Sequence, residues 1–123
     1  MTRHLKGKGE ADYDEVHDIL FFKTKERDYD RSIELYNLVV DIDTENFLTG
    51  IQIFEASKFL RIPKTALRKI PRWDFCANVD KNTIEVRLKF QTMWRNKVIE
   101  KNPIIVESIG ENLPDSEMVC VTA

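Results

Sequence analysis

The residues best equipped for chemistry cluster near the start of the chain. Four carboxylates and one imidazole fall within residues 12–18, as Asp12, Asp14, Glu15, His17 and Asp18. Such a set can bind a divalent cation. On an extended strand, however, the spacing of Asp14 and His17 directs the two side chains to opposite faces. The segment also lacks the glycine and the closing glutamate of a calcium-binding loop. We therefore expect a hydrated strand entry here, and keep an enzyme with an Asp/His site near residues 12–18 as a second alternative.

No other group of residues fits a catalytic pattern. Asp41, Asp43 and Glu55 could supply an acid and a base across a hairpin, but Asp43 belongs to the turn. Such catalysis also needs a pocket that separates the two pKa values. Ser57 lies in no nucleophile motif. Cys76 and Cys120 lack the spacing of a zinc site and are expected to be free thiols. We predict no catalytic residue, no metal and no cofactor, and thus a protein that is not an enzyme.

The strongest binding signal is a basic segment from Ala56 to Trp73, which has no acidic residue although the whole chain has a formal net charge of -2. Its cations are Lys58, Arg61, Lys64, Arg68, Lys69 and Arg72. These charges could neutralise phosphates while the indole of Trp73 stacks on a base, which is how many nucleic-acid sites work. The segment also fits a helix that turns its charges to water, or a surface for an acidic protein, since no base-reading motif is present.

Length and composition limit the class of protein. The chain has 123 residues, 42% of them hydrophobic and 33% charged, which is typical of one domain with its own core. No apolar run approaches the roughly 20 residues that cross a bilayer, so we expect a cytoplasmic protein without membrane contact. Residues 1–11 are basic and lack periodicity, which predicts a frayed N-terminus. Residues 12–123 are predicted to form a single globular domain.

The elements that would position these residues are mainly strands. The run at residues 19–22 predicts a strand, and the charged residues 25–31 predict a solvated connection to the next one. Between Glu34 and Leu60, two apolar runs surround a polar turn at residues 43–46, which predicts a β-hairpin. In the first run, one face is apolar and consists of Tyr36, Leu38, Val40 and Ile42. Gly50 predicts a bulge in the second run. Three strands would thus precede a helix.

The second half of the chain predicts a helix and more strands. Pro63 and Pro71 bracket a short helix. The apolar stripe of this segment should lie on the sheet, whether the segment is one kinked helix or two. Residues 83–91 alternate cleanly, and residues 75–79, 98–99 and 104–106 predict further strands, with the last either separate or continuous past Pro103. Residues 118–121 could add an edge strand. The predicted fold is α+β and mainly antiparallel β: two β-meander regions, in residues 12–60 and 61–123, joined by a short central helix packed on the sheet.

Several spaced residues resemble the prokaryotic domain of unknown function 2283. They are Tyr13-Asp14 followed by Asp18, then Val39-Val40-Asp41-Ile42-Asp43, then Gly50-Ile51-Gln52-Ile53, then Ala56-Ser57. The resemblance covers residues 13–60 and implies a three-stranded sheet followed by a helical turn, without an established activity. Two positions depart from the family pattern, because Gln52 replaces a glutamate and Asn46 replaces a turn glycine. Residues 61–123 lie outside the resemblance and are expected to be this protein's own extension.

The resemblance also suggests a role. Some members of that family look like partners of small toxin-like proteins, which implies an antitoxin-like or regulatory binding role. We expect an uncharacterised protein-interaction module that binds an unknown protein or a second copy of itself, presenting a sheet edge or the basic segment. The first alternative is a nucleic-acid or phosphate-binding domain that uses residues 56–73.

Overall fold

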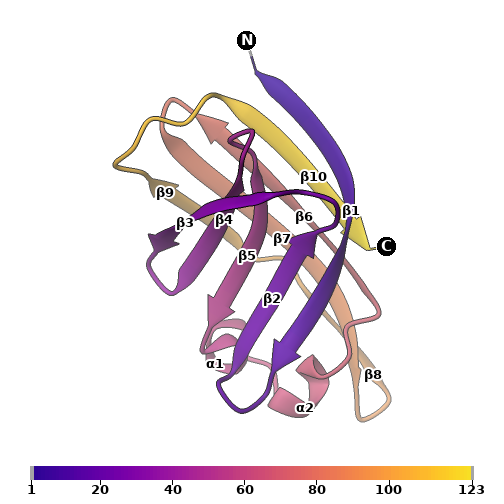
Figure 1. Ribbon diagram of the computed structural model, residues 1–123. Helices are drawn as coiled ribbons and strands as arrows, with labels where there is room; N and C mark the ends of the chain where they lie inside the picture. The colour runs from indigo at the N-terminus through magenta and orange to yellow at the C-terminus, as the bar shows by residue number, and fades with distance from the viewer. Residues whose placement is uncertain (1, 123) are drawn as a thin grey trace.

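The computed structural model describes residues 2–122, which form ten strands and two short helices (Figure 1). The first half of the chain supplies β1 (Arg3–Asp14), β2 (Ile19–Thr24), β3 (Tyr29–Leu35), β4 (Leu38–Asp43) and β5 (Leu48–Phe54). The rest supplies α1 (Ala56–Leu60), α2 (Lys64–Leu67), β6 (Arg72–Asp80), β7 (Thr83–Trp94), β8 (Lys97–Lys101), β9 (Ile104–Ser108) and β10 (Ser116–Thr122). Neither helix is long and apolar enough to cross a membrane.

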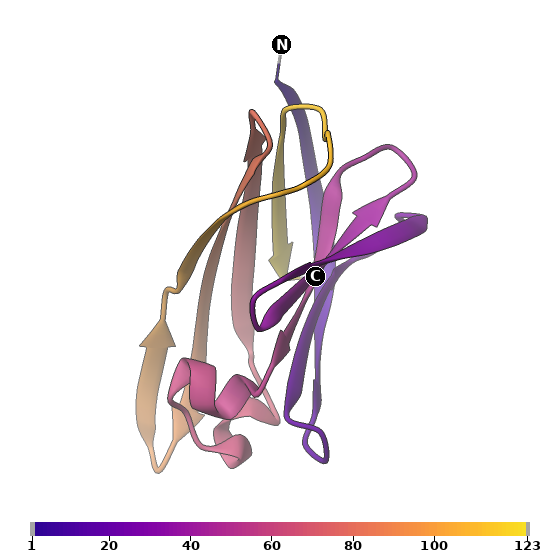
Figure 2. The same ribbon diagram turned by 90° about the vertical axis from the view of Figure 1, so that its left-hand side faces the viewer.

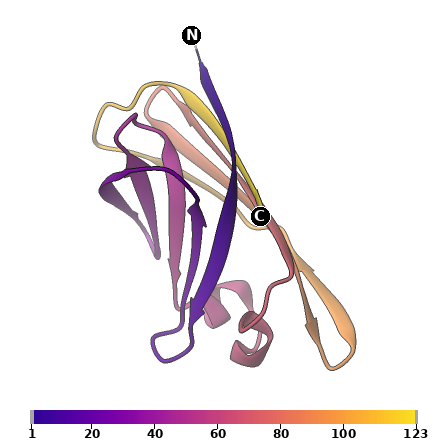
Figure 3. The ribbon, with the colours of Figure 1, turned by 45° about the vertical axis from the view of Figure 1, so that its right-hand side comes forward.

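All ten strands of the described chain belong to one sheet, in the order β3-β4-β5-β2-β1-β10-β6-β7-β8, with β9 also paired to β7. The long strand β1 pairs in parallel with β10 through its first half and antiparallel with β2 through its second half (Figure 3). As a result the sheet folds onto itself (Figure 2). We call β2–β5 with the second half of β1 the first layer, and β6–β10 with the first half of β1 the second layer.

The apolar faces of the two layers meet in the core. Val40 and Ile53, on neighbouring strands of the first layer, are both 0% exposed, which confirms the predicted core face of the hairpin. Phe75 and Phe90 of the second layer are buried in the same hydrophobic core. Over most of their length, β4, β6 and β7 alternate a buried with a more exposed position, as expected when one face of a sheet is dry and the other is wet. β5 departs from this pattern, because Leu48, Thr49, Gly50 and Ile51 are all buried.

Gly9 lies where β1 passes from one layer to the other, since it pairs with both Thr122 of β10 and Thr24 of β2. A Cβ at this position would lie 2.5 Å from the Cys120 Sγ, 2.5 Å from the Lys23 carbonyl oxygen and 2.7 Å from the Trp73 ring. The sheet can therefore fold this tightly because β1 carries no side chain there.

Several expectations about strands are wrong. Residues 3–11 are not frayed but form most of β1, and β3 begins inside the expected solvated connection, at Tyr29, so that five strands precede the helices in residues 2–122. The alternation of β1 is hard to see because glycines occupy two of its inward positions. Tyr36 lies in the β3–β4 turn at a φ of 60° and is exposed, outside the apolar face. The expected edge strand is β10, which lies between β1 and β6 in the middle of the sheet.

The helical segment forms two helices, one of the two arrangements that the sequence left open. In residues 2–122 it consists of the five-residue α1 and the four-residue α2, separated at Arg61, which takes a left-handed φ of 56°. Leu60, Ala66 and Leu67 are buried. The two helices lie at one end of the space between the layers (Figure 2). The fold is thus mostly antiparallel β-sheet with a small helical part.

Gly50 forms the predicted bulge. Asp41 pairs with Gly50 while the next residue, Ile42, pairs with Leu48, so that Thr49 is the extra residue of β5. A Cβ on Gly50 would lie 2.9 Å from the Asp41 Oδ2 and 3.2 Å from the Phe22 carbonyl oxygen. The Asp41 side chain and the Phe22 carbonyl therefore occupy the space that a side chain at Gly50 would need.

Replacing Gly50 with valine should lower the free energy of unfolding by about 2 kcal/mol, despite the preference of valine for strands, because the added side chain must displace Asp41 and approach a carbonyl. Urea unfolding of the parent and the variant measures the difference. An equal or higher urea midpoint in the variant would show that Asp41 and the Phe22 carbonyl move aside without penalty.

Candidate functional site

The turn between β1 and β2 splits the acidic cluster of residues 12–18. The Asp14 Oδ2 lies 2.8 Å from the His17 Nδ1, and the Asp14 Oδ1 accepts a hydrogen bond from the His17 backbone N–H. The two side chains meet, contrary to our expectation, because residues 15–18 form a turn and not a strand. The hydrogen bond with the His17 side chain holds the pKa of Asp14 below its usual value. No three His, Cys, Asp or Glu side chains within residues 2–122 are grouped for a metal.

Asp18 turns away from this pair and joins the two ends of the family-like segment. Its Oδ1 accepts hydrogen bonds from the Tyr13 hydroxyl at 2.6 Å and the Ser57 backbone N–H at 3.0 Å, and its Oδ2 accepts one from the Ser57 hydroxyl at 2.6 Å. The Asp18 carbonyl also accepts a hydrogen bond from the Ala56 N–H. These contacts tie the β1–β2 turn to the first turn of α1. We call Tyr13, Asp18 and Ser57 the clamp.

The electrostatics of the clamp favour a structural role. Burial opposes ionisation of Asp18, but the hydrogen bonds from Ser57 and Tyr13 outweigh it and hold the pKa of Asp18 below its usual value. Burial, together with the hydrogen bond to Asp18, raises the pKa of Tyr13. The Ser57 hydroxyl donates to the Asp18 carboxylate, and the lowered pKa of this carboxylate makes it a weak base for activating a serine nucleophile.

Asp43, the second aspartate of the family-like turn, is also structural. It is 1% exposed, and its Oδ1 accepts hydrogen bonds from the backbone N–H groups of Glu45 and Phe47 at 2.9 and 2.8 Å. Its Oδ2 accepts a hydrogen bond from the Arg27 Nε at 2.7 Å. Asn46 takes a left-handed φ of 64° in the same turn, a conformation that asparagine tolerates better than most residues. The replacement of the family's glycine at this position is therefore conservative.

The outer face of the first layer is the most distinctive surface of the family-like segment. Its residues are found from the strand pairing, because paired residues share a face and their neighbours along each strand are buried. Three rows cross it: Ile19 with Phe54, then Phe21 with Gln52 and Val39, then Lys23 with Gly50, Asp41 and Ser32. The four apolar residues, Ile19, Phe21, Val39 and Phe54, are all partly exposed. This face thus presents apolar side chains from three neighbouring strands.

A polar network borders these apolar residues. The Asp41 Oδ1 accepts hydrogen bonds from the Ser32 hydroxyl at 2.8 Å and the Gln52 Nε2 at 3.1 Å, and the hydroxyls of Tyr29 and Ser32 lie 2.7 Å apart. A glutamate in place of Gln52 would set a second carboxylate against Asp41, so the amide suits this chain.

Two hollows open on the same face. One, of about 140 Å³, is lined by Lys23, Thr24, Arg27, Tyr29, Asp41, Thr49 and Gly50. The other, of about 520 Å³, lies over Phe21 and is lined by Glu10, Ala11, Asp12, Phe21 and Lys23. The face is therefore uneven and partly apolar, which suits contact with another molecule better than a flat charged face would.

The basic segment of residues 56–73 does not supply the exposed stacking indole that the nucleic-acid alternative requires. Its six cations are all exposed, but Trp73 is 3% exposed and lies in the core. Its ring centroid is 4.8 Å from that of Phe22, and it stacks on Phe75 at 6.2 Å. The indole is thus unavailable as a stacking face for a base.

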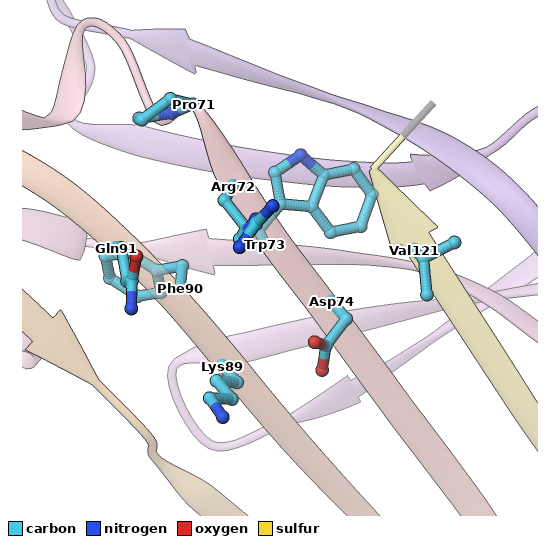
Figure 4. Close-up of a pocket in the computed structure, with 8 residues that line it drawn as sticks. All are labelled: Pro71, Arg72, Trp73, Asp74, Lys89, Phe90, Gln91 and Val121. Atoms are coloured by element: carbon cyan, nitrogen blue, oxygen red, sulfur yellow. The ribbon is translucent and has the colours of Figure 1, made fainter.

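The cations of this segment are also divided. Arg68 makes two hydrogen bonds to Glu15 across the end of the molecule, at 2.5 and 2.8 Å, and Lys58 lies 3.9 Å from Glu55. Arg72 projects from β6 and lines a hollow of about 600 Å³ with Asp74, Lys89 and Gln91 (Figure 4). Acidic neighbours therefore offset part of the positive charge of the segment, and Arg72 lies on the surface formed by β6 and β7.

A second basic surface was missed from the sequence. Lys6, Lys8 and Lys25 line a hollow of about 370 Å³ where β1 leaves β2, together with Glu26 and with Arg27, whose guanidinium is paired with Asp43 and Glu45. The signal was the alternation of His4, Lys6 and Lys8 with Leu5, Gly7 and Gly9, which is a strand with one charged face. It was overlooked because residues 1–11 were expected to be frayed.

The fold is that of a mainly antiparallel β protein. Its first layer carries the spaced residues that resemble a known family, and comparison with known proteins identifies that family. The model of the family described as protein of unknown function DUF2283 matches residues 11–57, from the second half of β1 to the start of α1. Residues 11–57 of the chain belong to this family. No solved structure matches the chain.

Two archaeal relatives extend the similarity. The chain is 30% identical over 105 residues to a Methanosarcina mazei protein named "Putative hypoxanthine phosphoribosyltransferase", and the match covers 85% of each chain. It is 25% identical over 115 residues to an uncharacterized protein of Methanocaldococcus jannaschii, covering 91% of this chain and 97% of that one. Matches of this length must include much of residues 61–123. The expectation that these residues are this protein's own extension is therefore wrong.

Proposed function

We propose that this chain is a non-enzymatic protein-interaction module with a regulatory, antitoxin-like role, and that the outer face of the first layer binds its protein partner. The observation that carries the proposal is the set of partly exposed apolar residues on that face, centred on Phe21 and Val39. These residues lie in the part of the chain that matches the family model.

The chemistry of this face supports protein contact. Interfaces typically combine an apolar centre that includes aromatic residues with a polar rim. Here Phe21 and Phe54 supply the aromatic groups, and Asp41 with its hydrogen-bond donors supplies part of the rim. Because the strands are rigid and the Asp41 side chain is already held, binding would order few side chains and lose little conformational entropy.

Binding of a phosphate-bearing ligand is the second candidate. Two observations favour it: the name of the Methanosarcina mazei relative, which speaks of a phosphoribosyltransferase, and the hollow lined by Lys6, Lys8, Lys25 and Arg27. Nucleic-acid binding by residues 56–73 is less well supported, because Trp73 lies in the core.

Affinity purification of the full chain from its host, followed by reconstitution with the purified partner, tests the first candidate. Replacing Phe21 with lysine should weaken partner binding by about 30-fold or more, as for an interface hot spot. Val119→Lys is the matched control, because Val119 is also a partly exposed apolar strand residue but lies on the outer face of the second layer. Both variants should unfold near the parent temperature, since neither side chain belongs to the core.

Two results would contradict the proposal. One is partner binding that Phe21→Lys leaves unchanged and Val119→Lys abolishes, because the contact surface would then be the second layer. The other is saturable binding of hypoxanthine or of a phosphoribosyl compound in calorimetry, lost when Lys6 and Lys8 are replaced by glutamate. That result would favour the second candidate.

A further inference from the structure

The described part of the sheet ends in two free edges, which differ in how they are protected. β3 forms one edge, and β8 and β9, which pair with different parts of β7, form the other. A free edge presents unpaired backbone donors and acceptors to any strand that can align with it. β3 carries Asp30, Arg31 and Glu34, and its register shifts between Tyr29 and Arg31. Charges and irregular pairing of this kind discourage the addition of a strand. β9 begins with Ile104, Ile105 and Val106 and pairs with β7 without a shift, so its edge has no such protection over these three residues.

The backbone groups at this edge point outward. Leu88 donates its N–H to the Pro103 carbonyl, and Ile109 donates its N–H to the Asn82 carbonyl. In an antiparallel pair, residues alternate between bonding to the partner strand and pointing away from it. Ile105 therefore bonds to β7, whereas the N–H and C=O groups of Ile104, Val106 and Ser108 point to the free edge.

Pro103 does not block this edge, although a proline often does so. It lies in the set of residues that face β7, so its missing N–H removes a bond inside the sheet and none at the free side. The outward side chains are apolar as well, because Ile104 is 59% exposed and Val106 is 54% exposed. Ile105 faces inward and packs against the core.

We propose that two copies of this chain pair through β9, antiparallel, about a two-fold axis at Ile105. In this register Ile104 lies opposite the partner's Val106, and Ile105 lies opposite the partner's Ile105. Ile104 and Val106 are the residues whose N–H and C=O groups are free, so they form the hydrogen-bonded pairs that an antiparallel ladder requires. The contact of Ile104 with Val106 occurs twice, and Ile105 meets its own copy on the axis, as in an isologous interface.

The charges along the edge agree with this register. Glu107 lies opposite the partner's Pro103, and Ser108 lies opposite the partner's Asn102, so no like charges face each other. The same symmetry centred on Ile99 of β8 would place Lys97 opposite the partner's Lys101, which is unfavourable. The pairing extends the second layer and does not use the outer face of the first layer, so it is independent of the proposed function.

Sedimentation velocity of the full chain over about a hundredfold range of concentration tests the pairing, since a self-associating protein shifts toward dimer by mass action. The parent should form a dimer, and Val106→Pro should weaken it at least tenfold, because it removes a free-edge N–H without removing a bond to β7. Val106→Lys serves the same purpose if the proline variant does not fold. Val98→Lys is the control, because Val98 is an outward, 64% exposed valine on β8 and should leave association unchanged.

Cysteine cross-linking tests the register. In a Cys76→Ser background, Ile105→Cys should form a disulfide-linked dimer on mild oxidation. The two copies of residue 105 form a non-hydrogen-bonded antiparallel pair, in which the Cα atoms are about 4.5 Å apart. Ile104→Cys and Val106→Cys should cross-link only when the two variants are mixed. A parent that stays monomeric throughout would overturn the proposal. So would equal weakening by Val98→Lys, or self-linking of Val106→Cys without that of Ile105→Cys.

Discussion

Replacing Gly9 with alanine is expected to lower the free energy of unfolding by about 3 kcal/mol or more, the upper range for an overpacked site. The new methyl group would lie 2.5 Å from the Lys23 carbonyl oxygen and 2.5 Å from the Cys120 Sγ. A flexible side chain can move away from such an overlap, but the Lys23 carbonyl belongs to β2 and moves only with the strand. The variant must therefore open the sheet where its two layers join.

Gly110→Ala is the matched control, because a Cβ at Gly110 meets no atom within 4 Å. Neither glycine requires a positive φ, so the two variants differ in packing and not in backbone strain. Urea unfolding followed by tryptophan fluorescence would measure both, since Trp73 lies 2.7 Å from the added Cβ of the first variant. Equal stability of the two variants would show that β1 shifts freely against β2 and β10.

The local parts of the fold were predictable from the sequence. The β4–β5 hairpin has a polar turn and one continuous apolar face, and both features depend on residues within about 20 positions of each other. Val40, Ile53 and the bulge at Gly50 were therefore predicted correctly. The parallel pairing of β1 with β10 joins the two ends of the chain, and no alternation pattern encodes such a contact.

The candidate site was less predictable, for a physical reason. The run Ile19-Leu20-Phe21-Phe22 is apolar on both faces of β2, so the sequence cannot tell which side chains enter the core. The structure places Leu20 and Phe22 inside and leaves Ile19 and Phe21 on the outer face. In the same way, Trp73 beside six cations suggested an exposed stacking residue, although an isolated tryptophan near strands more often belongs to the core.

The clamp explains why several spaced residues of the family-like segment occur together. Tyr13, Asp18 and Ser57 are 44 positions apart from first to last, yet they share one carboxylate. In the sequence, the three clamp residues resemble a catalytic motif, because all three side chains are polar and can exchange protons. Here their hydrogen bonds are directed at one another, which indicates a structural role for the clamp.

Replacing Asp18 with alanine is expected to lower the free energy of unfolding by about 3 kcal/mol at neutral pH. The change leaves the Tyr13 hydroxyl, the Ser57 hydroxyl and the Ser57 backbone N–H without their acceptor, and each buried donor left unpaired costs about 1–3 kcal/mol. Asp14→Ala is the matched control, because it removes a carboxylate that is also hydrogen-bonded but faces solvent, and it should change stability little.

The effect of Asp18→Ala should also depend on pH. The pKa of Asp18 is lowered in the folded protein, so the folded state binds its proton less readily than the unfolded chain, where the pKa is about 3.9. The stabilisation by Asp18 is thus fully present above that value and is lost as the pH falls through the lower folded pKa. The stability difference between the parent and Asp18→Ala should therefore be constant from neutral pH to about pH 5 and shrink below about pH 4. Urea unfolding at a series of pH values measures it, and a difference that persists unchanged at the acid end would mean that Asp18 stabilises the fold through packing and not through its charge.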